Sequence, residues 1–193
     1  SIMVRSHLVI AGSNFIFSHI NENYGEFFLE KKRKLLVIFR GINTQYFDNS
    51  KITNDKVQNI YSSFSISPKK IKILLPGRLT KWKGQELFIE SLNLLKKKYS
   101  KDNFQAIILG SHQGRSIYFK KLVSLIEKHG LKRDIMFINH IEEMPVAYYV
   151  SDIVVSSSIE PEAFGRISVE AQSMRRPILA SNHGGSKETI MNG

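Results

Sequence analysis

Several residue types and motifs are absent from this 193-residue sequence, and each absence excludes a class of protein. Cysteine is absent, so disulfide bonds play no part and a reducing, cytoplasmic setting is expected. No apolar run approaches the roughly 20 residues that span a bilayer. A G-x-G-x-x-G dinucleotide fingerprint is also missing. Because the histidines lack ligand spacing and no Asp-x-Asp sequence occurs, no metal site is predicted.

The composition describes a small globular protein with a strong positive charge. Hydrophobic residues make up 42% of the chain, which is enough to bury a core, and the net charge is +11. A basic protein suits an anionic partner, either a phosphorylated substrate or an anionic membrane surface. The basic clusters Lys31–Lys34 and Lys96–Lys98 fall near predicted helix ends, where solvation explains them equally well. No aromatic-interleaved basic patch is present, so a nucleic-acid partner is not expected.

The hydrophobic pattern predicts alternating strands and helices. Strands are predicted near residues 7–11, 35–39, 71–75, 104–109, 135–138, 153–156 and 178–180. Helices are predicted near residues 13–24, 53–64, 85–99, 115–129, 143–149, 165–174 and 185–191. In the helix at 85–99, the predicted apolar face comprises Leu87, Phe88, Ser91, Leu92, Leu94 and Leu95. The strict alternation after residue 71 indicates an α/β fold, a Rossmann-like parallel sheet flanked by helices.

Two glutamates near the end of the chain form the first candidate binding element. Glu162 and Glu170 lie eight positions apart, after the apolar run Asp152–Val155. This order predicts a buried strand, a turn that holds Glu162, and a helix with Glu170 about two turns inside it. Carboxylates accept hydrogen bonds and a helix N-terminus favours phosphate, so the element suits a ligand with hydroxyl and phosphate groups. Taken alone, such a pair is more often ordinary surface glutamate.

A basic loop upstream forms the second element. The segment Gly77–Gly84, with the sequence G-R-L-T-K-W-K-G, follows one predicted strand and precedes a helix. Arg78 and Lys83 therefore project from the carboxyl end of a strand, where open α/β sheets bind ligands. An arginine fork and a lysine point charge suit a diphosphate. Solvated loop cations are the alternative for this segment alone, and the two elements together favour a binding site.

Together these elements resemble the retaining glycosyltransferases of family 4, which have the two-lobed GT-B fold. The C-terminal, nucleotide-sugar-binding lobe of that family carries a G-R-x-x-x-x-K-G-type loop and an E-x7-E motif, matched here by Gly77–Gly84 and Glu162–Glu170. Glu142–Tyr149 resembles the family's short helix before the signature strand, and Pro177–Ile190 resembles its G-G-x-x-E-x-I segment. The basic loop also resembles those of bacterial lipopolysaccharide and surface-polysaccharide enzymes.

The resemblance implies a reaction and a role for particular residues. A hexosyl unit would pass from a nucleoside diphosphate sugar to a glycan or lipid-linked acceptor, with retention at the anomeric carbon. Arg78 and Lys83 would stabilise the departing diphosphate, Glu162 would hold the donor sugar, and these three are the predicted catalytic residues. Glu170 would accept hydrogen bonds from the ribose. The predicted nucleotide-binding residues are Gly77, His140, Ile141, Phe164, Gly165, Arg166 and Glu170, with His140 and Ile141 near the base.

The resemblance also implies that the chain has three parts and is incomplete. Residues 1–40 would be the tail of the N-terminal, acceptor-binding lobe, residues 41–66 the hinge and connecting helix, and residues 67–193 the donor lobe, truncated at its end. In the hinge, Phe39 and Arg40 replace the Pro-Asn of the family's I-P-N-G-V-D sequence. The chain alone is therefore expected to bind nucleotide without turnover, and to self-associate through the apolar strands of its tail.

Several alternatives remain at the level of sequence. Another GT-B enzyme is one, either a sugar-nucleotide epimerase, which would lack this E-x7-E arrangement, or a glycogen-type synthase, which uses a related one. A non-catalytic nucleotide-binding module is another, and the intact motifs argue against it. No cofactor is implied beyond the donor itself. The expected location is cytoplasmic, with peripheral contact to the inner face of the cytoplasmic membrane through the positive charge.

Overall fold

The computed structural model describes residues 6–30, 34–99 and 103–190. A parallel sheet of five strands forms its centre, in the order β5-β4-β3-β6-β7. The strands are β3 (Ile71–Pro76), β4 (Phe104–Leu109), β5 (Ile135–Ile138), β6 (Ile153–Ser156) and β7 (Ile178–Ala180). Every residue of β4 is buried, as expected for a sheet covered on both faces. The predicted α/β fold with a parallel sheet is confirmed.

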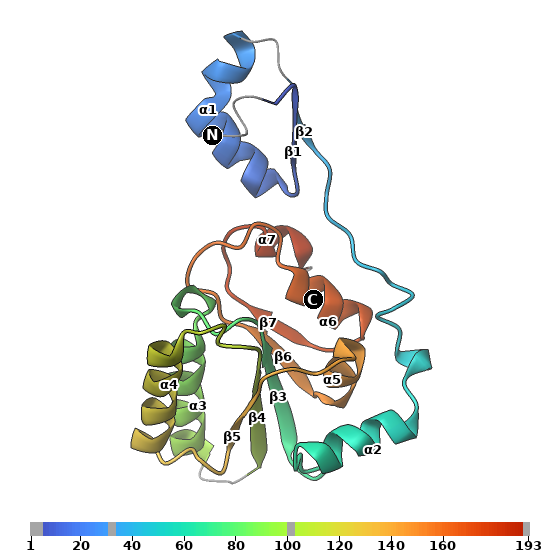
Figure 1. Ribbon diagram of the computed structural model, residues 1–193, viewed down its shortest axis with the longest axis vertical. Coiled ribbons are helices and arrows are strands. Elements are labelled where there is room, and N and C mark those ends of the chain that lie inside the picture. The colour runs from blue at the N-terminus through green and yellow to red at the C-terminus, as the bar shows by residue number, and fades with distance from the viewer. Residues whose placement is uncertain (1–5, 31–33, 100–102, 191–193) are drawn as a thin grey trace.

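Helices cover both faces of this sheet (Figure 1). They are α2 (Asn54–Ser63), α3 (Gln85–Tyr99), α4 (Ser116–Lys128), α5 (Met144–Val150) and α6 (Arg166–Ser173), and the short helix α7 (Ser186–Thr189) lies against α6. The alternating side chains of the strands divide the core in two. Ile73 and Ile108 pack in one cluster with α3 and α4, whereas Leu74 and Ile107 pack in the other with α2, α5 and α6.

The apolar face of α3 differs from the prediction. Leu87, Leu94 and Leu95 are 50%, 65% and 36% exposed, so the sequence assigned them to the wrong face. The buried side chains are Gln85, Phe88, Ile89, Leu92 and Asn93. These positions follow i, i+3, i+4 and i+7 spacing. The prediction missed them because the buried face includes two polar residues while several leucines lie on the exposed face. The basic cluster Lys96–Lys98 does lie in the last turn of the helix, as predicted.

The first part of the chain forms a separate unit, drawn in blue above the sheet in Figure 1. Its strands β1 (Leu8–Ala11) and β2 (Lys34–Val37) pair in parallel, and the helix α1 (Asn14–Glu30) connects them along the chain. This helix runs beyond the predicted end at residue 24, because buried Phe28 anchors its later turns although Gly25 weakens them. Most of the cluster Lys31–Lys34 lies outside the described residues.

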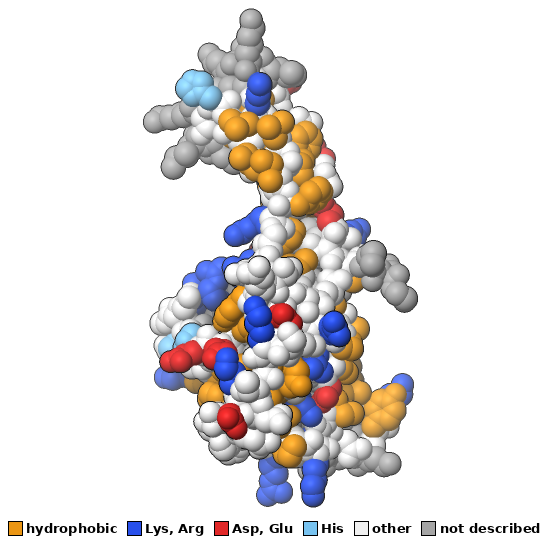
Figure 2. Space-filling view, turned by 90° about the vertical axis from the view of Figure 1, so that its right-hand side faces the viewer, with side chains coloured by type: hydrophobic (Ala, Val, Ile, Leu, Met, Phe, Trp, Pro, Cys, Tyr) orange, Lys and Arg blue, Asp and Glu red, His pale blue; other side chains and the backbone are white. Residues whose placement is uncertain are grey.

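Apolar side chains gather on this N-terminal unit, at the top of Figure 2. Its exposed large apolar residues include Leu8 (46%), Ile10 (52%), Leu36 (46%), Ile38 (55%) and Phe39 (57%). A short two-stranded sheet buries little on its own and leaves such side chains in water. The self-association predicted from the sequence would occur at this face and stays a prediction.

Hydrogen bonds from Ser13, Asn14 and Phe15 join the N-terminal unit to the lower lobe. The hydroxyl of Ser13, which is fully buried, donates to the carbonyl of Ala163 over 2.5 Å. The carboxylate of Glu188 accepts the N–H groups of Asn14 and Phe15 over 2.8 and 2.7 Å. These amides begin α1, so Glu188 acts as a helix cap supplied by a distant segment. The glutamate of the predicted G-G-x-x-E-x-I segment therefore ties the two units together.

Replacing Glu188 with alanine is expected to loosen the N-terminal unit while leaving the lower lobe intact. Loss of a cap costs about 1 kcal/mol, because the first amides of α1 lose their acceptor. Hydrogen exchange should accelerate about fivefold in α1 and β1, with unchanged exchange in β3 and β4. The variant Lys187→Ala is the matched control. Equal acceleration in both variants would show that Glu188 does not hold the two units together.

Candidate functional site

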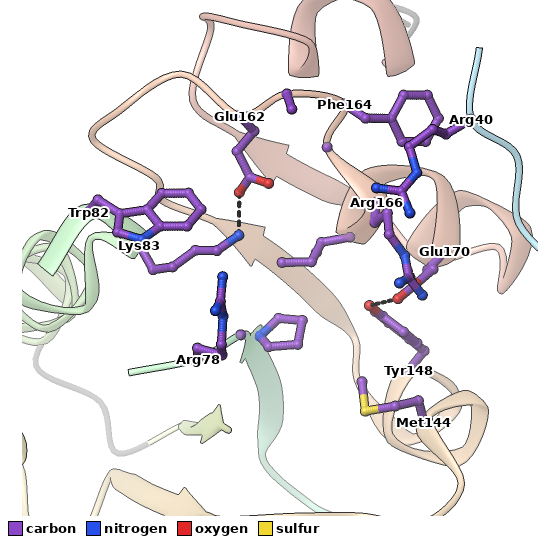
Figure 3. Close-up of a pocket in the computed structure, with 15 residues that line it drawn as sticks. Arg40, Arg78, Trp82, Lys83, Met144, Tyr148, Glu162, Phe164, Arg166 and Glu170 are labelled. Carbon is purple, nitrogen blue, oxygen red and sulfur yellow. Dashed lines mark hydrogen bonds and ion pairs between the residues drawn. The ribbon is translucent and has the colours of Figure 1, made fainter. Parts of the chain in front are cut away.

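A cleft lies at the carboxyl ends of β3 and β6, where the strand order reverses. The chain passes from β3 outward to β4 and β5, and then returns to β6 on the other side of β3. Such a switch point is where open α/β sheets bind ligands. The cleft has a volume of about 510 Å³ (Figure 3). Its lining includes eight predicted residues: Gly77, Arg78, Lys83, Glu162, Phe164, Gly165, Arg166 and Glu170.

An ion pair between Lys83 and Glu162 joins the two loops at this switch point. Lys83 Nζ lies 2.7 Å from Glu162 Oε1, and the two side chains are only 13% and 11% exposed. The hydroxyls of Ser158 and Ser156 donate to the same oxygen over 2.5 and 3.5 Å. Since these contacts all go to Oε1, the second carboxylate oxygen remains an acceptor for a ligand hydroxyl. Arg78 extends into the cleft below this pair (Figure 3).

The loop that carries Lys83 is held by close backbone packing. Gly84 has a φ of +72°, and a Cβ atom there would lie 1.9 Å from the carbonyl oxygen of Ser157. The hydroxyl of Ser157 donates to the carbonyls of Lys83 and Gly84 over 3.2 and 3.0 Å. Glycine is therefore required, since any side chain would separate the loops. Lys83 Nζ lies 4.4 Å from the centroid of the Trp82 ring, so the ammonium makes a cation–π contact with the indole.

Glu170 lies closer to the start of its helix than predicted. Gly165 has a φ of +86° and α6 begins at Arg166, one residue after the predicted bound, so Glu170 is the fifth helical residue and lies less than two turns inside. Its side chain is 9% exposed and hydrogen-bonded at both oxygens. Arg166 donates to Oε1 over 2.8 and 3.2 Å, and the hydroxyl of Tyr148 donates to Oε2 over 2.8 Å.

Tyr148 is a residue of this site that the sequence did not single out. It is fully buried in α5 and also lines the cleft. Burial, together with the negative charge of Glu170, raises the pKa of Tyr148 well above its ordinary value of 10. The phenol therefore keeps its proton and serves as a fixed donor to Glu170. The surrounding pattern of Glu142–Tyr149 marked the helix, but only packing shows which tyrosine faces the carboxylate.

Removing the Tyr148 hydroxyl is expected to lower stability modestly. In Tyr148→Phe one oxygen of buried Glu170 loses its donor, which costs about 1–2 kcal/mol. Urea unfolding measures the change. Tyr149→Phe removes a hydroxyl at the neighbouring position, where the ring stacks 5.2 Å from the Arg176 guanidinium, and should stay within about 0.5 kcal/mol. Equal costs for the two variants would contradict a specific role for Tyr148.

Two predicted residues lie elsewhere, and one unpredicted cation lies in the cleft. His140 and Ile141 line a different cavity of about 450 Å³, beside α2 and Glu143. The structure therefore does not bring them to Glu170, and their contact with a base stays a prediction. Arg40, from the segment after β2, lines the cleft and lies near Phe164 (Figure 3). The sequence marked Arg40 only as a charged residue at the position where the hinge sequence I-P-N-G-V-D has a neutral asparagine.

The charges of the cleft suit a dianionic ligand. Four of its lining residues are cationic, namely Arg40, Arg78, Lys83 and Arg166, and two are carboxylates, Glu162 and Glu170. The carboxylates each pair with one cation, Lys83 and Arg166, which leaves an excess of two positive charges. In the described ranges no cluster of His, Asp or Glu is arranged to hold a metal ion. Nor does any described helix combine the length and hydropathy needed to cross a membrane.

Fold and site together define an α/β protein with a cationic cleft at the switch point of a parallel sheet. Residues 57–193 match the family model of the glycosyl transferases group 1, so the chain belongs to that family. The lower lobe has the architecture of one lobe of the two-lobed GT-B glycosyltransferases. A crystal structure of a glycosyltransferase from Rickettsia africae is similar to it, with a TM-score of 0.88 and 34% identity, covering all of this chain and 48% of that one.

Other relatives extend the comparison. An uncharacterized glycosyltransferase of Methanocaldococcus jannaschii, MJ1607, is 28% identical over 173 residues, or 89% of this chain and 42% of the relative. The capsular polysaccharide biosynthesis glycosyltransferase CapM of Staphylococcus aureus is 24% identical over 86% of this chain and 42% of its own length. Anabaena HepE, solved in complex with UDP and glucose, shares the fold at a TM-score of 0.81 and 23% identity, over 100% of this chain and 50% of HepE. The chain thus spans about half the length of these relatives.

Proposed function

We propose that this chain forms the donor-binding half of a retaining glycosyltransferase. It would bind a nucleoside diphosphate sugar, from which a hexosyl unit passes to a glycan or lipid-linked acceptor in bacterial surface-polysaccharide or lipopolysaccharide synthesis. The observation that carries this proposal is the cleft with two carboxylates and an excess of two positive charges. Family membership and the UDP complex of the structurally similar HepE support it.

The cleft suggests where each part of the donor would bind. A diphosphate carries two negative charges, and Arg78 with Lys83 would hold it at the end of β3. Glu162 would hold the sugar through its second carboxylate oxygen. Glu170, at the other end of the cleft, would accept the ribose hydroxyls. Because both Glu170 oxygens already have donors, the ribose would share the carboxylate with Tyr148 and Arg166.

The contacts of Glu162 bear on the mechanism of retention. Lys83, Ser158 and Ser156 all donate to Glu162 Oε1 and fix the orientation of the carboxylate, which leaves its second oxygen to accept a hydroxyl of the donor sugar. We therefore assign Glu162 to holding the sugar. The leaving phosphate would take the proton of the acceptor hydroxyl, while Arg78 and Lys83 stabilise its developing charge. A metal ion is not required in this scheme.

The chain organisation follows from the same proposal. Residues 1–40 would belong to the acceptor lobe, residues 41–66 to the hinge, and residues 67–193 to the donor lobe. In the structure Phe47, Ile60 and Ile66 of the middle segment pack in a core cluster of the lower lobe. Acceptor binding and peripheral contact with an anionic membrane would involve parts beyond this donor lobe. No nucleic-acid partner is proposed.

Titration with uridine nucleotides tests the proposal, with UDP and UDP-glucose as probes and inorganic diphosphate as the comparison. The sequence contains one tryptophan, Trp82, and it lines the cleft, so its fluorescence reports binding directly. Saturable changes with UDP that are absent with diphosphate alone are expected. A thermal-shift assay with ADP, GDP and UDP ranks the three nucleotides, and the one that stabilises the protein most identifies the preferred base. Absence of any nucleotide response up to millimolar concentration would overturn the donor-site assignment.

A further inference from the structure

A second cavity lies on the other side of the Trp82 loop. It has a volume of about 640 Å³ and lies between the loop after β3 and the first turn of α4. Trp82 lines both this cavity and the donor cleft. None of the residues proposed above for donor binding lines it. This cavity is therefore distinct from the donor cleft and shares only the Trp82 side of its lining with it.

Buried polar atoms in this cavity lack partners. Thr80 is only 8% exposed, and its hydroxyl oxygen has no hydrogen bond in the described part of the chain. Glu86 is less buried, with its side chain 30% exposed; its Oε1 also has no hydrogen bond in the described part of the chain, whereas Oε2 pairs with Lys121 over 2.6 Å. An unpaired buried polar group costs free energy, and a ligand that bonds to it recovers this cost. These two oxygens point to a ligand with hydroxyl groups.

The cavity is also positively charged and opens at a helix N-terminus. The Ser116 N–H at the start of α4 donates to the carbonyl of Gly114 over 2.9 Å, whereas the next amides have no acceptor within the helix and the side chain of the N-cap residue, Arg115, supplies none. Lys81, Arg115 and Lys121 face a single carboxylate, Glu86, so two positive charges remain in excess. Within the described ranges, the side chain of Arg115 donates hydrogen bonds to neutral groups, Gln113 Oε1 at 3.1 Å and the carbonyl of His112 at 3.5 Å. The helix end and the excess charge favour an anionic group.

The remaining wall of the cavity is apolar and aromatic. It includes the rings of Trp82 and Tyr118 and the side chain of Ile117, which is 86% exposed. Tyr118 is held in place because its hydroxyl donates to Gln85 Oε1 over 3.2 Å. Aromatic rings of this kind offer flat apolar surfaces to the C–H faces of a sugar, while nearby polar groups fix its hydroxyls.

We propose that this cavity is an accessory site for an anionic saccharide, a sugar that carries a phosphate or carboxylate group. The aromatic wall would take the ring, Thr80 and Glu86 the hydroxyls, and Arg115 with the α4 amides the anion. The shared Trp82 wall places such a sugar beside the donor cleft, where a charged acceptor chain would extend. The site rests on its own residues, so it stands or fails separately from the donor assignment.

Fluorescence and calorimetric titrations test this site, with UDP present at saturation to occupy the donor cleft. The probes are glucose 6-phosphate, glucuronate, glucose, inorganic phosphate and vesicles that contain an anionic lipid. The two anionic sugars should bind at least about tenfold more tightly than glucose or phosphate, since each of those supplies only half of the contacts. Equal affinity for phosphate and the anionic sugars would reduce the site to an anion site, and binding to anionic vesicles but not to sugars would replace the proposal with a lipid site.

Matched variants locate the binding. Arg115→Ala and Lys121→Ala should each weaken glucose 6-phosphate about tenfold, because each removes a charge-assisted contact. Lys120→Ala removes the same charge from the adjacent, exposed position outside the cavity and should have no effect. Thr80→Val keeps the shape of the side chain and removes its hydroxyl, so it tests the sugar contact that we assign to Thr80. Lys83→Met, which disables the proposed donor cleft, should leave glucose 6-phosphate binding unchanged; equal losses in Lys120→Ala and Lys121→Ala would overturn the proposal.

Discussion

Replacing Lys83 with methionine is expected to lower both the stability of the protein and its affinity for diphosphates. The change removes the ammonium but keeps the apolar stem, and it leaves the carboxylate of Glu162 buried at 11% exposure without its cation. Breaking a buried ion pair costs about 3–5 kcal/mol, and the lower end applies here because Ser158 and Ser156 still donate to Glu162. Urea unfolding measures this loss.

The binding effect of Lys83→Met separates a phosphate contact from general damage. Affinity for UDP should fall far more than affinity for uridine, and the difference should shrink at high salt because charge interactions are screened. The double variant Lys83→Met/Glu162→Gln removes the unpaired charge and should recover stability without recovering UDP binding. Lys81→Met, two residues earlier in the same loop and exposed, is the matched control. Equal losses for uridine and UDP would reject the diphosphate clamp.

Glu170→Ala is expected to weaken nucleotide binding roughly 10- to 150-fold, the equivalent of one charged hydrogen bond of about 1.5–3 kcal/mol. The ribose loses its acceptor, and Arg166 and Tyr148 lose the carboxylate that now orders them. In contrast to Lys83→Met, the loss should be the same for uridine and UDP, because both contain the ribose. Isothermal titration calorimetry measures it.

A second variant shows whether the charge of Glu170 matters apart from its packing. Glu170→Gln keeps the size of the side chain and one carbonyl acceptor for Tyr148, so it should preserve more stability than the alanine variant. It should still bind UDP more weakly than the original protein. Glu127→Ala, which breaks a surface pair with Lys132, is the control for loss of a glutamate. Unchanged calorimetry for both Glu170 variants would remove this residue from the site.

The order and type of the elements were predictable because strand and helix patterns alternate cleanly after residue 71. The strands at 104–109, 135–138 and 153–156 have the predicted bounds. The helix ends were less predictable, since they depend on tertiary contacts. The helix α1 continues to Glu30 because Phe28 is buried, and α6 begins at Arg166, one residue after the predicted bound, because Gly165 takes a left-handed conformation.

The sequence by itself determined the fold class and brought Arg78, Lys83, Glu162 and Glu170 forward as candidates, because spacing after predicted strands places them at one edge of a parallel sheet. Only the tertiary structure decided their partners. The pairing of Lys83 with Glu162 joins positions 79 residues apart, and that of Tyr148 with Glu170 joins two helices. Periodicity describes which face of one element is apolar, whereas such pairs depend on how loops of different strands pack, as Gly84 against Ser157 illustrates.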